Sequence, residues 1–252
     1  MTARAAAPPA YGWAQAYDRL LGRAGFGHVW PAFLRAARRF RLAPDSVADL
    51  GCGTGLFLEA VADRWPAARL VGVDLSPAML EAAGRRLAGR RATLVRGDIR
   101  HVRLSRPVSL VTCNFDTVNY LTRQDDIQEM VNRLRENLCH GGHLIFDLIC
   151  WTAGPIMPAL VQDIRLPTFR GKWLIAPFPD NQGSRVVMLN RQWTGTGWHA
   201  WRESHVQRWW PIGTITRHLR AAGLGPLAVT PVVPGARGTP AARWVQVVAL
   251  RE

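Results

Sequence analysis

The stretch Val47–Gly55 reads V-A-D-L-G-C-G-T-G, and the rest of the sequence can be arranged around it. It begins as a short apolar strand with Asp49 near its end, and glycines then follow at positions 51, 53 and 55. Glycines at this spacing let the backbone turn sharply and approach a ligand closely. The apolar residues after the last glycine predict a helix, whose first N–H groups and positive dipole end would face the same ligand.

This spacing differs from the dinucleotide-binding fingerprint G-x-G-x-x-G, because the third glycine comes one residue early and an acid precedes the first. It resembles motif I of the class I S-adenosylmethionine (SAM)-dependent methyltransferases. In that family the turn faces the methionine and ribose portion of SAM. The resemblance implies a set of cofactor-binding residues in this turn: Asp49, Gly51, Cys52, Gly53 and Gly55.

Asp74 ends the next predicted strand, Arg69–Asp74, which is apolar on both faces as a central parallel strand should be. It lies about 20 residues beyond the glycine turn, the spacing at which α/β nucleotide-binding folds place a ribose ligand. Ser76 and Pro77 already supply an N-cap and a first residue for the following helix. We therefore expect the Asp74 carboxylate to be free for both ribose hydroxyls. The resemblance adds two residues that would flank the adenine, Leu75 and Met79.

Two further strands, expected at 92–97 and 108–114, each lead into polar residues. The first is followed by a G-D-I segment. In the family that the chain resembles, this segment brings an acid near the adenine amino group and an apolar residue onto the ring. The residues implied here are Gly97, Asp98 and Ile99.

The loop after the second of these strands reads N-F-D-T-V-N-Y-L from Asn114 and resembles the F-D-S-x-N-Y-L loop of bacterial small-molecule and cofactor methyltransferases. The resemblance implies SAM contacts from Asn114 and Phe115. It also implies a catalytic cleft lined by Asp116, Asn119 and Tyr120. The alternative is that Asp116 and Asn119 hydrogen-bond the loop to itself, and both can hold at once.

Residues 11–40 read as helical, with breaks at Gly22, Gly25 and Gly27 and a second helix starting at Pro31. The pattern A-x-x-Y-D that contains Tyr17 resembles the N-terminal cap of small-molecule methyltransferases, in which a tyrosine reaches over SAM. It implies two aromatic cofactor contacts, Tyr11 and Tyr17, of which Tyr17 would also line the catalytic cleft. The alternative makes Tyr17 a packing residue with a surface hydroxyl.

Residues 151–210 are rich in proline and tryptophan. Antiparallel strands are expected at 185–193 and 198–209, joined by a T-G-T-G turn, and we expect this insertion to cover the cleft and choose the substrate. Glu203 and His205 would share one strand face. His205 is the candidate general base, although a hydrogen-bonded structural histidine is an equally good interpretation.

The expected fold is α/β: a Rossmann-like seven-stranded sheet with an antiparallel last strand, as in the class I methyltransferases, plus an antiparallel cap insertion. The sequence divides into four expected parts: an N-terminal helical lid (1–40), a SAM-binding core (41–150), the cap (151–210) and the C-terminal part of the core sheet (211–252). The remaining expected elements are helices at 124–138 and 211–222, and strands at 143–149, 227–232 and 243–250.

The formal net charge of +14 would suit a nucleic-acid partner. However, all but one of the 32 basic residues are arginine and they are scattered, which indicates a GC-rich genome rather than a binding stripe. No N-P-P-Y or D-P-P-Y motif of base-amine methylation occurs. We therefore expect a small-molecule substrate and no nucleic acid.

The four cysteines have no paired spacing and are interpreted as reduced core residues of a cytoplasmic protein. The sequence has no apolar run long enough to span a membrane, and its first ten residues lack the apolar core of a signal peptide. Cys139, His140 and His143 lie where a helix stops and a strand begins, so no metal site is predicted.

These observations predict a SAM-dependent methyltransferase that modifies a nitrogen or oxygen of a small molecule, for example in natural-product biosynthesis, and acts as a monomer or homodimer. Three alternatives remain open. The enzyme could use SAM without methyl transfer, by moving its aminocarboxypropyl arm or by cyclising it with release of methylthioadenosine. It could be an RNA methyltransferase, or a SAM-binding partner protein without catalytic activity.

Overall fold

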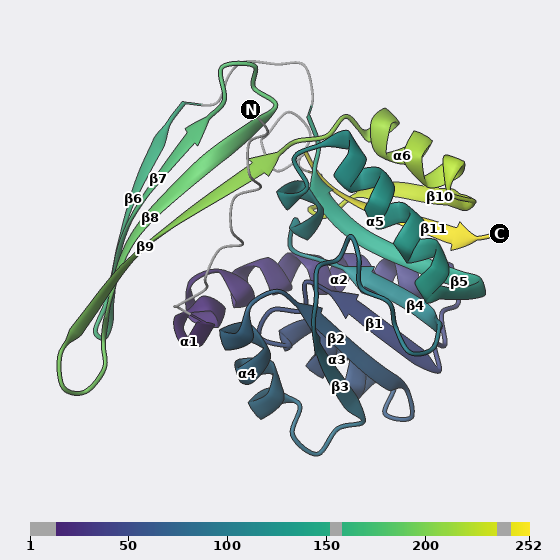
Figure 1. The fold of residues 1–252 in the computed structure, drawn as a ribbon, viewed down its shortest axis with the longest axis horizontal. Helices are drawn as coiled ribbons and strands as arrows, with labels where there is room; N and C mark the ends of the chain where they lie inside the picture. The colour runs from purple at the N-terminus through teal and green to yellow at the C-terminus, as the bar shows by residue number, and fades with distance from the viewer. Residues whose placement is uncertain (1–13, 152–157, 236–242) are drawn as a thin grey trace.

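The computed structural model describes residues 14–151, 158–235 and 243–252, which form a seven-stranded sheet flanked by helices and a separate four-stranded sheet (Figure 1). The strands of the large sheet lie in the order β10-β11-β5-β4-β1-β2-β3. β11 runs in the opposite direction to the other six strands. Their bounds are β1 Ser46–Leu50, β2 Arg69–Asp74, β3 Ala92–Arg96, β4 Val108–Cys113, β5 Leu138–Ile149, β10 Leu224–Pro231 and β11 Trp244–Arg251. The predicted class I methyltransferase topology is confirmed.

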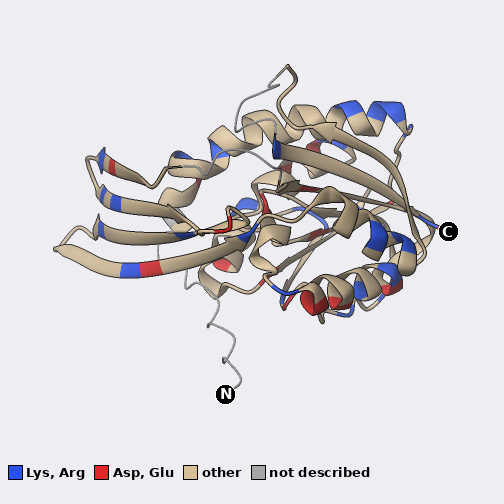
Figure 2. Ribbon diagram, turned by 90° about the horizontal axis from the view of Figure 1, so that it is seen from above, with Lys and Arg blue, Asp and Glu red and all other residues tan. Residues whose placement is uncertain are grey.

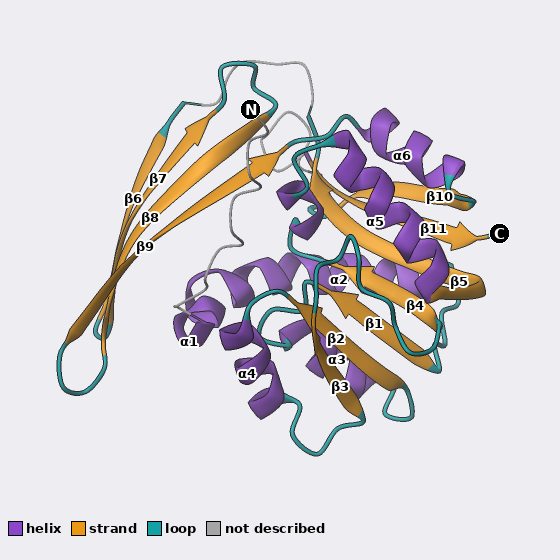
Figure 3. Ribbon diagram, in the orientation of Figure 1, coloured by secondary structure: helices purple, strands orange, loops and turns teal. Residues whose placement is uncertain are grey.

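Helices cover both faces of the large sheet (Figure 3). On one face α5 (Gln124–Asn137) and α6 (Ile212–Ala221) bury their apolar sides against β4, β5 and β11. On the other, α2 (Arg23–Arg39) and α3 (Leu56–Arg64) bring Phe33 and Phe57 into edge-to-face contact, with ring centroids 5.0 Å apart. A fifth helix, α4, spans Pro77–Arg86 and is capped by Ser76, as the sequence predicts. These two cores fix the carboxyl ends of β1, β2 and β4 along one edge.

The N-terminal part of the chain differs from the expectation, because its glycines do not break the helix. α1 (Ala14–Tyr17) continues through a π-helical segment, η1 (Asp18–Gly22), directly into α2, and Pro31 lies inside α2. Gly25 has a packing reason instead: a Cβ there would lie 3.0 Å from the Phe115 ring. Gly25 is therefore explained by the close approach of the loop that contains Phe115, and not by a helix end.

The cap is a four-stranded antiparallel sheet: β6 (Leu160–Leu166), β7 (Phe169–Pro177), β8 (Gly183–Trp193) and β9 (Trp198–Arg208). The T-G-T-G hairpin is confirmed, with the Thr194 N–H donating to the Gly197 carbonyl at 3.0 Å. β6 and β7 were not expected, because prolines that flank strands were interpreted as irregular chain. One face of the cap sheet packs on α1 around Ala16, Phe169, Trp173 and Met188.

β5 begins at Leu138, earlier than predicted, and contains Gly141 in the left-handed region (φ 73°). Cys139 in this strand is exposed, contrary to the expectation of four core cysteines, whereas Cys52, Cys113 and Cys150 are buried. Lys and Arg residues are spread over the cap strands and several helices (Figure 2). Within the described ranges, none of the helices combines the length and apolar character needed to cross a bilayer.

Candidate functional site

The glycine turn after β1 adopts a conformation that only glycine tolerates well. Gly51, Gly53 and Gly55 all have positive φ angles of 75°, 53° and 78°. A Cβ at Gly51 would lie 2.6 Å from the Thr117 side chain, so the turn packs tightly on the loop after β4. At Gly53, by contrast, no described atom lies within 4 Å of such a Cβ. The turn is thus clamped at Gly51 and open at Gly53, as close approach by a ligand requires.

Asp74 at the end of β2 is tied to the same turn. Its carboxylate accepts the Gly53 N–H at 2.9 Å and the Ser76 N–H at 2.8 Å, and burial raises its pKa. The expectation that Asp74 would be free is therefore wrong, because it fixes the turn to the following helix. Each carboxylate oxygen can accept more than one hydrogen bond, so contact with a ribose remains compatible with this geometry.

Asp49 and Asn114 lie together at the ends of β1 and β4. The Thr112 hydroxyl donates to Asp49 at 2.7 Å and the Asn114 amide nitrogen lies 3.4 Å away. Burial raises the pKa of Asp49 to about 7. The Asn114 Oδ1 atom is buried and has no hydrogen-bond partner among the described residues. A buried acceptor without a partner usually marks a missing donor, and these two side chains would suit an amino group.

The loop after β4 holds two consecutive residues in the left-handed region, Phe115 (φ 57°) and Asp116 (φ 50°). For a residue other than glycine, each such backbone conformation costs about 1–3 kcal/mol of folding free energy. The carboxylate of Asp147 in β5 compensates by accepting both backbone N–H groups, at 2.9 Å and 2.6 Å. It also accepts the Trp244 indole N–H at 3.0 Å, and burial raises its pKa to about 6. Asp147 was missed in the sequence, although an aspartate inside an apolar strand was a usable signal.

Asp116 links the core to the cap. Its Oδ2 accepts the Gln207 side-chain N–H of β9 at 2.5 Å. Burial and the nearby Asp147 raise the pKa of Asp116 to about 7. The pKa of Tyr17 is also raised, mainly because the side chain is buried. Neighbouring groups add to this rise, in decreasing order Asp116, Tyr120, Asp18 and Asp74. The structure thus gathers around Tyr17 three of the predicted cleft and cofactor residues.

Asn119 has a different place from the one expected. It lies in the short 3₁₀ helix η2 (Thr117–Tyr120) and is fully buried. Its amide nitrogen donates to the carbonyls of Ile149 and Arg208, at 2.8 Å and 2.7 Å, and its oxygen accepts the Ile149 N–H at 2.8 Å. Burial and these hydrogen bonds support the alternative interpretation, in which Asn119 has a structural role. It joins the ends of β5 and β9.

The cap contributes a buried acid–imidazole pair beside Tyr120. His205 Nε2 lies 3.2 Å from Glu203 Oε2, and His205 Nδ1 lies 3.1 Å from the Tyr120 hydroxyl. Glu203 and His205 are 5% and 3% exposed, and they share one face of β9, as predicted. The Trp201 indole N–H donates to Glu203 Oε1 at 2.7 Å. The predicted cleft residues Tyr120 and His205 are therefore in contact.

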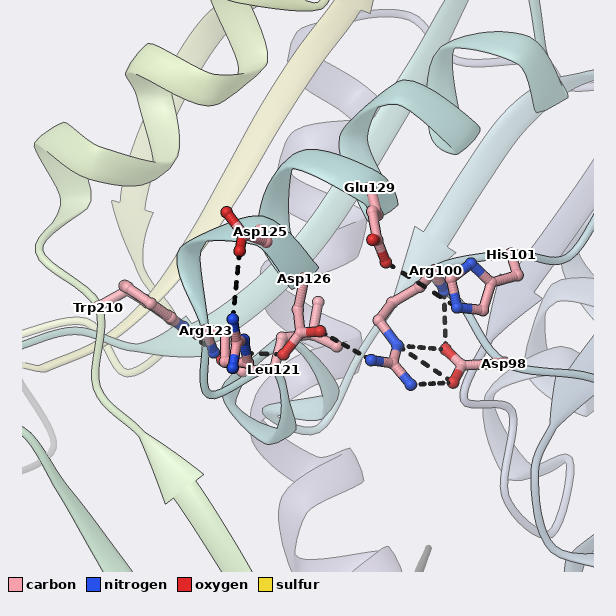
Figure 4. Close-up of polar contacts among 9 residues, drawn as sticks. All are labelled: Asp98, Arg100, His101, Leu121, Arg123, Asp125, Asp126, Glu129 and Trp210. Atoms are coloured by element: carbon pink, nitrogen blue, oxygen red, sulfur yellow. Dashed lines mark hydrogen bonds and ion pairs between the residues drawn. The ribbon is translucent and has the colours of Figure 1, made fainter. Parts of the chain in front are cut away.

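The residues predicted to surround the adenine lie beyond β2 and β3. Leu75 is exposed, whereas Met79 and Ile99 are buried. Asp98 forms an ion pair with Arg100, which also pairs with Asp126 of α5 (Figure 4). Burial acts to raise the pKa of Asp98, but the hydrogen bonds and charge of Arg100 outweigh it and lower the pKa. Gly97 packs against Val102, and its N–H donates to the Asp74 carbonyl at 3.1 Å.

The N-terminal segment is attached to the glycine turn by a polar network that the sequence did not predict. The Thr54 hydroxyl donates to Asp18 at 2.6 Å. Arg86 of α4 forms an ion pair with Asp18 and donates to the Thr54 carbonyl at 2.9 Å. A π-helical segment such as η1 is rare and often occurs at functional sites. Tyr11, the other predicted aromatic contact, lies outside the described residues.

The comparisons with known proteins agree with this geometry. Residues 47–142 match a family model described as a methyltransferase domain. Over 108 residues the chain is 38% identical to a trans-aconitate 2-methyltransferase from Pseudomonas aeruginosa, covering 43% of this chain and 37% of that protein. Over 135 residues it is 37% identical to a carboxy-S-adenosyl-L-methionine synthase from Chromohalobacter salexigens, covering 51% of this chain and 46% of that protein. Each match spans less than half of the relative.

The solved structure of a SAM-dependent methyltransferase from Clostridium acetobutylicum superposes with a TM-score of 0.79 at 21% identity, covering 94% of this chain and 96% of that one. Fold and sheet order thus define the class I SAM-dependent methyltransferase fold. Within this fold, the match to the methyltransferase domain model covers residues 47–142. Among the described residues, no group of three or more His, Cys, Asp or Glu could hold a metal ion.

Proposed function

We propose that this protein is a SAM-dependent methyltransferase that acts on a small molecule. The observation that carries the proposal is the glycine turn, which is open at Gly53 and held by the carboxylate of Asp74. SAM would supply an activated methyl group on a sulfonium. The chain would mainly bind it, align an acceptor and exclude water.

The residues at the sheet edge fit the parts of SAM. Asp74 can accept ribose hydroxyls, and Asp49 with the unpartnered Asn114 oxygen can accept an amino group. Leu75 offers exposed apolar surface for a base, and Asp98, although paired with Arg100, offers an acceptor. The buried acids Asp49, Asp74 and Asp147 lie at this edge, and a bound cation would favour their ionised form. A cationic cofactor would be favoured there.

A small acceptor is supported by the contacts that tie the N-terminal helix, the cap and the core together. α1 packs on the cap sheet, and Asp116 and Asn119 join the core to β9. A site covered in this way would suit a small molecule that is surrounded on binding better than a base within a folded RNA. We propose that the cap selects the acceptor, that Tyr17, Asp116 and Tyr120 line the cleft, and that His205 supports Tyr120 from behind.

Isothermal titration calorimetry with SAM and adenosylhomocysteine tests the proposal. We expect binding by the wild-type chain and clear weakening in Asp74→Asn. The matched control is Asp125→Asn, because the Asp125 side chain is 80% exposed on α5. No uptake of either ligand, or equal affinity in all three proteins, would contradict the proposal.

A second candidate uses SAM without methyl transfer. It is favoured by the similarity to a carboxy-S-adenosyl-L-methionine synthase, whose name describes a modified SAM rather than a methylated acceptor. Mass spectrometry of the spent cofactor separates the candidates. Adenosylhomocysteine supports methyl transfer, methylthioadenosine supports transfer or cyclisation of the aminocarboxypropyl arm, and a heavier SAM derivative supports modification of SAM itself.

A further inference from the structure

We propose that Glu203, His205 and Tyr120 form a proton relay that ends at the Tyr120 hydroxyl, and that the acceptor is therefore an amine or hydroxyl group rather than a carboxylate. This inference rests on the proposed function and deepens it. It concerns the proton that a protic acceptor must lose, and it distinguishes Tyr120 as the residue that touches the acceptor from two residues that act through it.

The hydrogen bonds set the direction of the relay. Glu203 sits 3.2 Å from His205 Nε2, and a carboxylate can only accept, so Nε2 carries the imidazole proton. The other nitrogen, Nδ1, then accepts the Tyr120 hydroxyl proton across 3.1 Å. Trp201 holds the second Glu203 oxygen at 2.7 Å. Both imidazole nitrogens are thus engaged, so His205 does not present one to a substrate.

The exposure of the three residues agrees with this direction. Glu203 and His205 are buried, whereas Tyr120 is only partly buried. Tyr120 also neighbours Tyr17, which in turn lies near Asp116 and Asp74. The Tyr120 hydroxyl therefore belongs to the group of side chains around Asp74, the residue predicted to bind the ribose. Glu203 and His205 lie behind it.

The proton balance of the relay is simple. A neutral N–H or O–H acceptor that gains a methyl group carries one surplus proton. That proton passes to the Tyr120 oxygen while the tyrosine's own proton passes to His205 Nδ1. The resulting imidazolium is paired with the Glu203 carboxylate, and the proton is later lost to water. A carboxylate is already deprotonated near neutral pH and needs no such relay. Tyr120 is the catalytic residue here, and His205 and Glu203 are positioning residues.

Nuclear magnetic resonance of the ligand-free protein tests the relay without any turnover. With labelled histidine and tyrosine, we expect the Nε2–H tautomer of His205 and a Tyr120 ring-carbon signal that shifts in His205→Gln. Glu203→Gln should reduce the preference for the Nε2–H tautomer, because an amide can donate as well as accept. The control is Glu81→Gln, an exposed side chain on α4. The Nδ1–H tautomer, or a Tyr120 signal indifferent to His205, would overturn the relay.

Turnover of SAM with amino sugars, polyols and trans-aconitate then tests the acceptor class. For an amine or hydroxyl acceptor, Tyr120→Phe should lower kcat by about 10²–10⁴-fold and leave the SAM dissociation constant within twofold. Turnover of trans-aconitate that Tyr120→Phe does not affect would refute the acceptor class. Calorimetry with SAM reports separately on the proposed function, since a failed relay leaves SAM binding intact, and lost SAM binding in the wild type removes the function itself.

Discussion

The substitution Gly53→Ala tests the central feature of the site, the open position in the glycine turn. Two separate effects are expected. The positive φ of 53° makes any Cβ unfavourable, by about 1–2 kcal/mol of folding stability. The added methyl group meets no described atom within 4 Å, so packing within the protein adds little to that cost. It does occupy space that we assign to SAM, where overpacking costs about 1–3 kcal/mol.

Gly89→Ala is the matched control, because Gly89 has a φ of 78° and also an open Cβ position, but lies in the turn after α4. Urea denaturation should show similar losses of stability for the two variants. Calorimetry should show a SAM dissociation constant that rises roughly 5- to 150-fold in Gly53→Ala and not in Gly89→Ala. Unchanged SAM affinity in a folded Gly53→Ala variant would refute the assignment of this space to the cofactor.

Three other predictions concern the carboxylates and the lid. Asp147→Asn should lower the free energy of unfolding by about 1–3 kcal/mol in urea denaturation. The reason is that the amide must turn one N–H toward the backbone donors of Phe115 and Asp116. A loss equal to that of the exposed control Asp125→Asn would contradict this. Asp49, Asp116 and Asp147 have raised pKa values of about 7, 7 and 6. The folded chain therefore holds protons that the unfolded chain releases near pH 4, and stability should fall as pH rises from about 4 to 7. Asp116→Asn should flatten this fall in denaturation curves measured across that pH range. Asp18→Asn removes the ion pair with Arg86 and should speed SAM dissociation several-fold in stopped-flow measurements, whereas Asp63→Asn, which breaks the exposed pair with Arg90, should not.

The sheet and the turn were predictable because their signals are local. The apolar run before Gly51, the acid at the end of β2 and the strand-to-loop change at Asn114 each lie within a few residues of sequence. A parallel sheet then brings their carboxyl ends to one edge without further information. The antiparallel β11 followed from the family resemblance and not from periodicity.

The contacts that close the site were not predictable in the same way, because they join residues far apart in the chain. Asp116 meets Gln207 and Asp18 meets Arg86, and nothing in either neighbourhood identifies the partner. Asn119 shows the opposite failure. Its loop resembles a cleft motif, but three backbone hydrogen bonds hold the side chain inside the protein.

The π-helical segment Asp18–Gly22 would let the helix before it move without melting. A π turn contains one residue more than an α turn. Each residue of an α-helix turns the chain by about 100°, so relaxing this bulge into regular helix would swing the side chains before it by roughly that angle. Tyr17 would leave the other cleft residues while the backbone hydrogen bonds were exchanged rather than lost. Entry to the cleft would then depend on a shift of helical register.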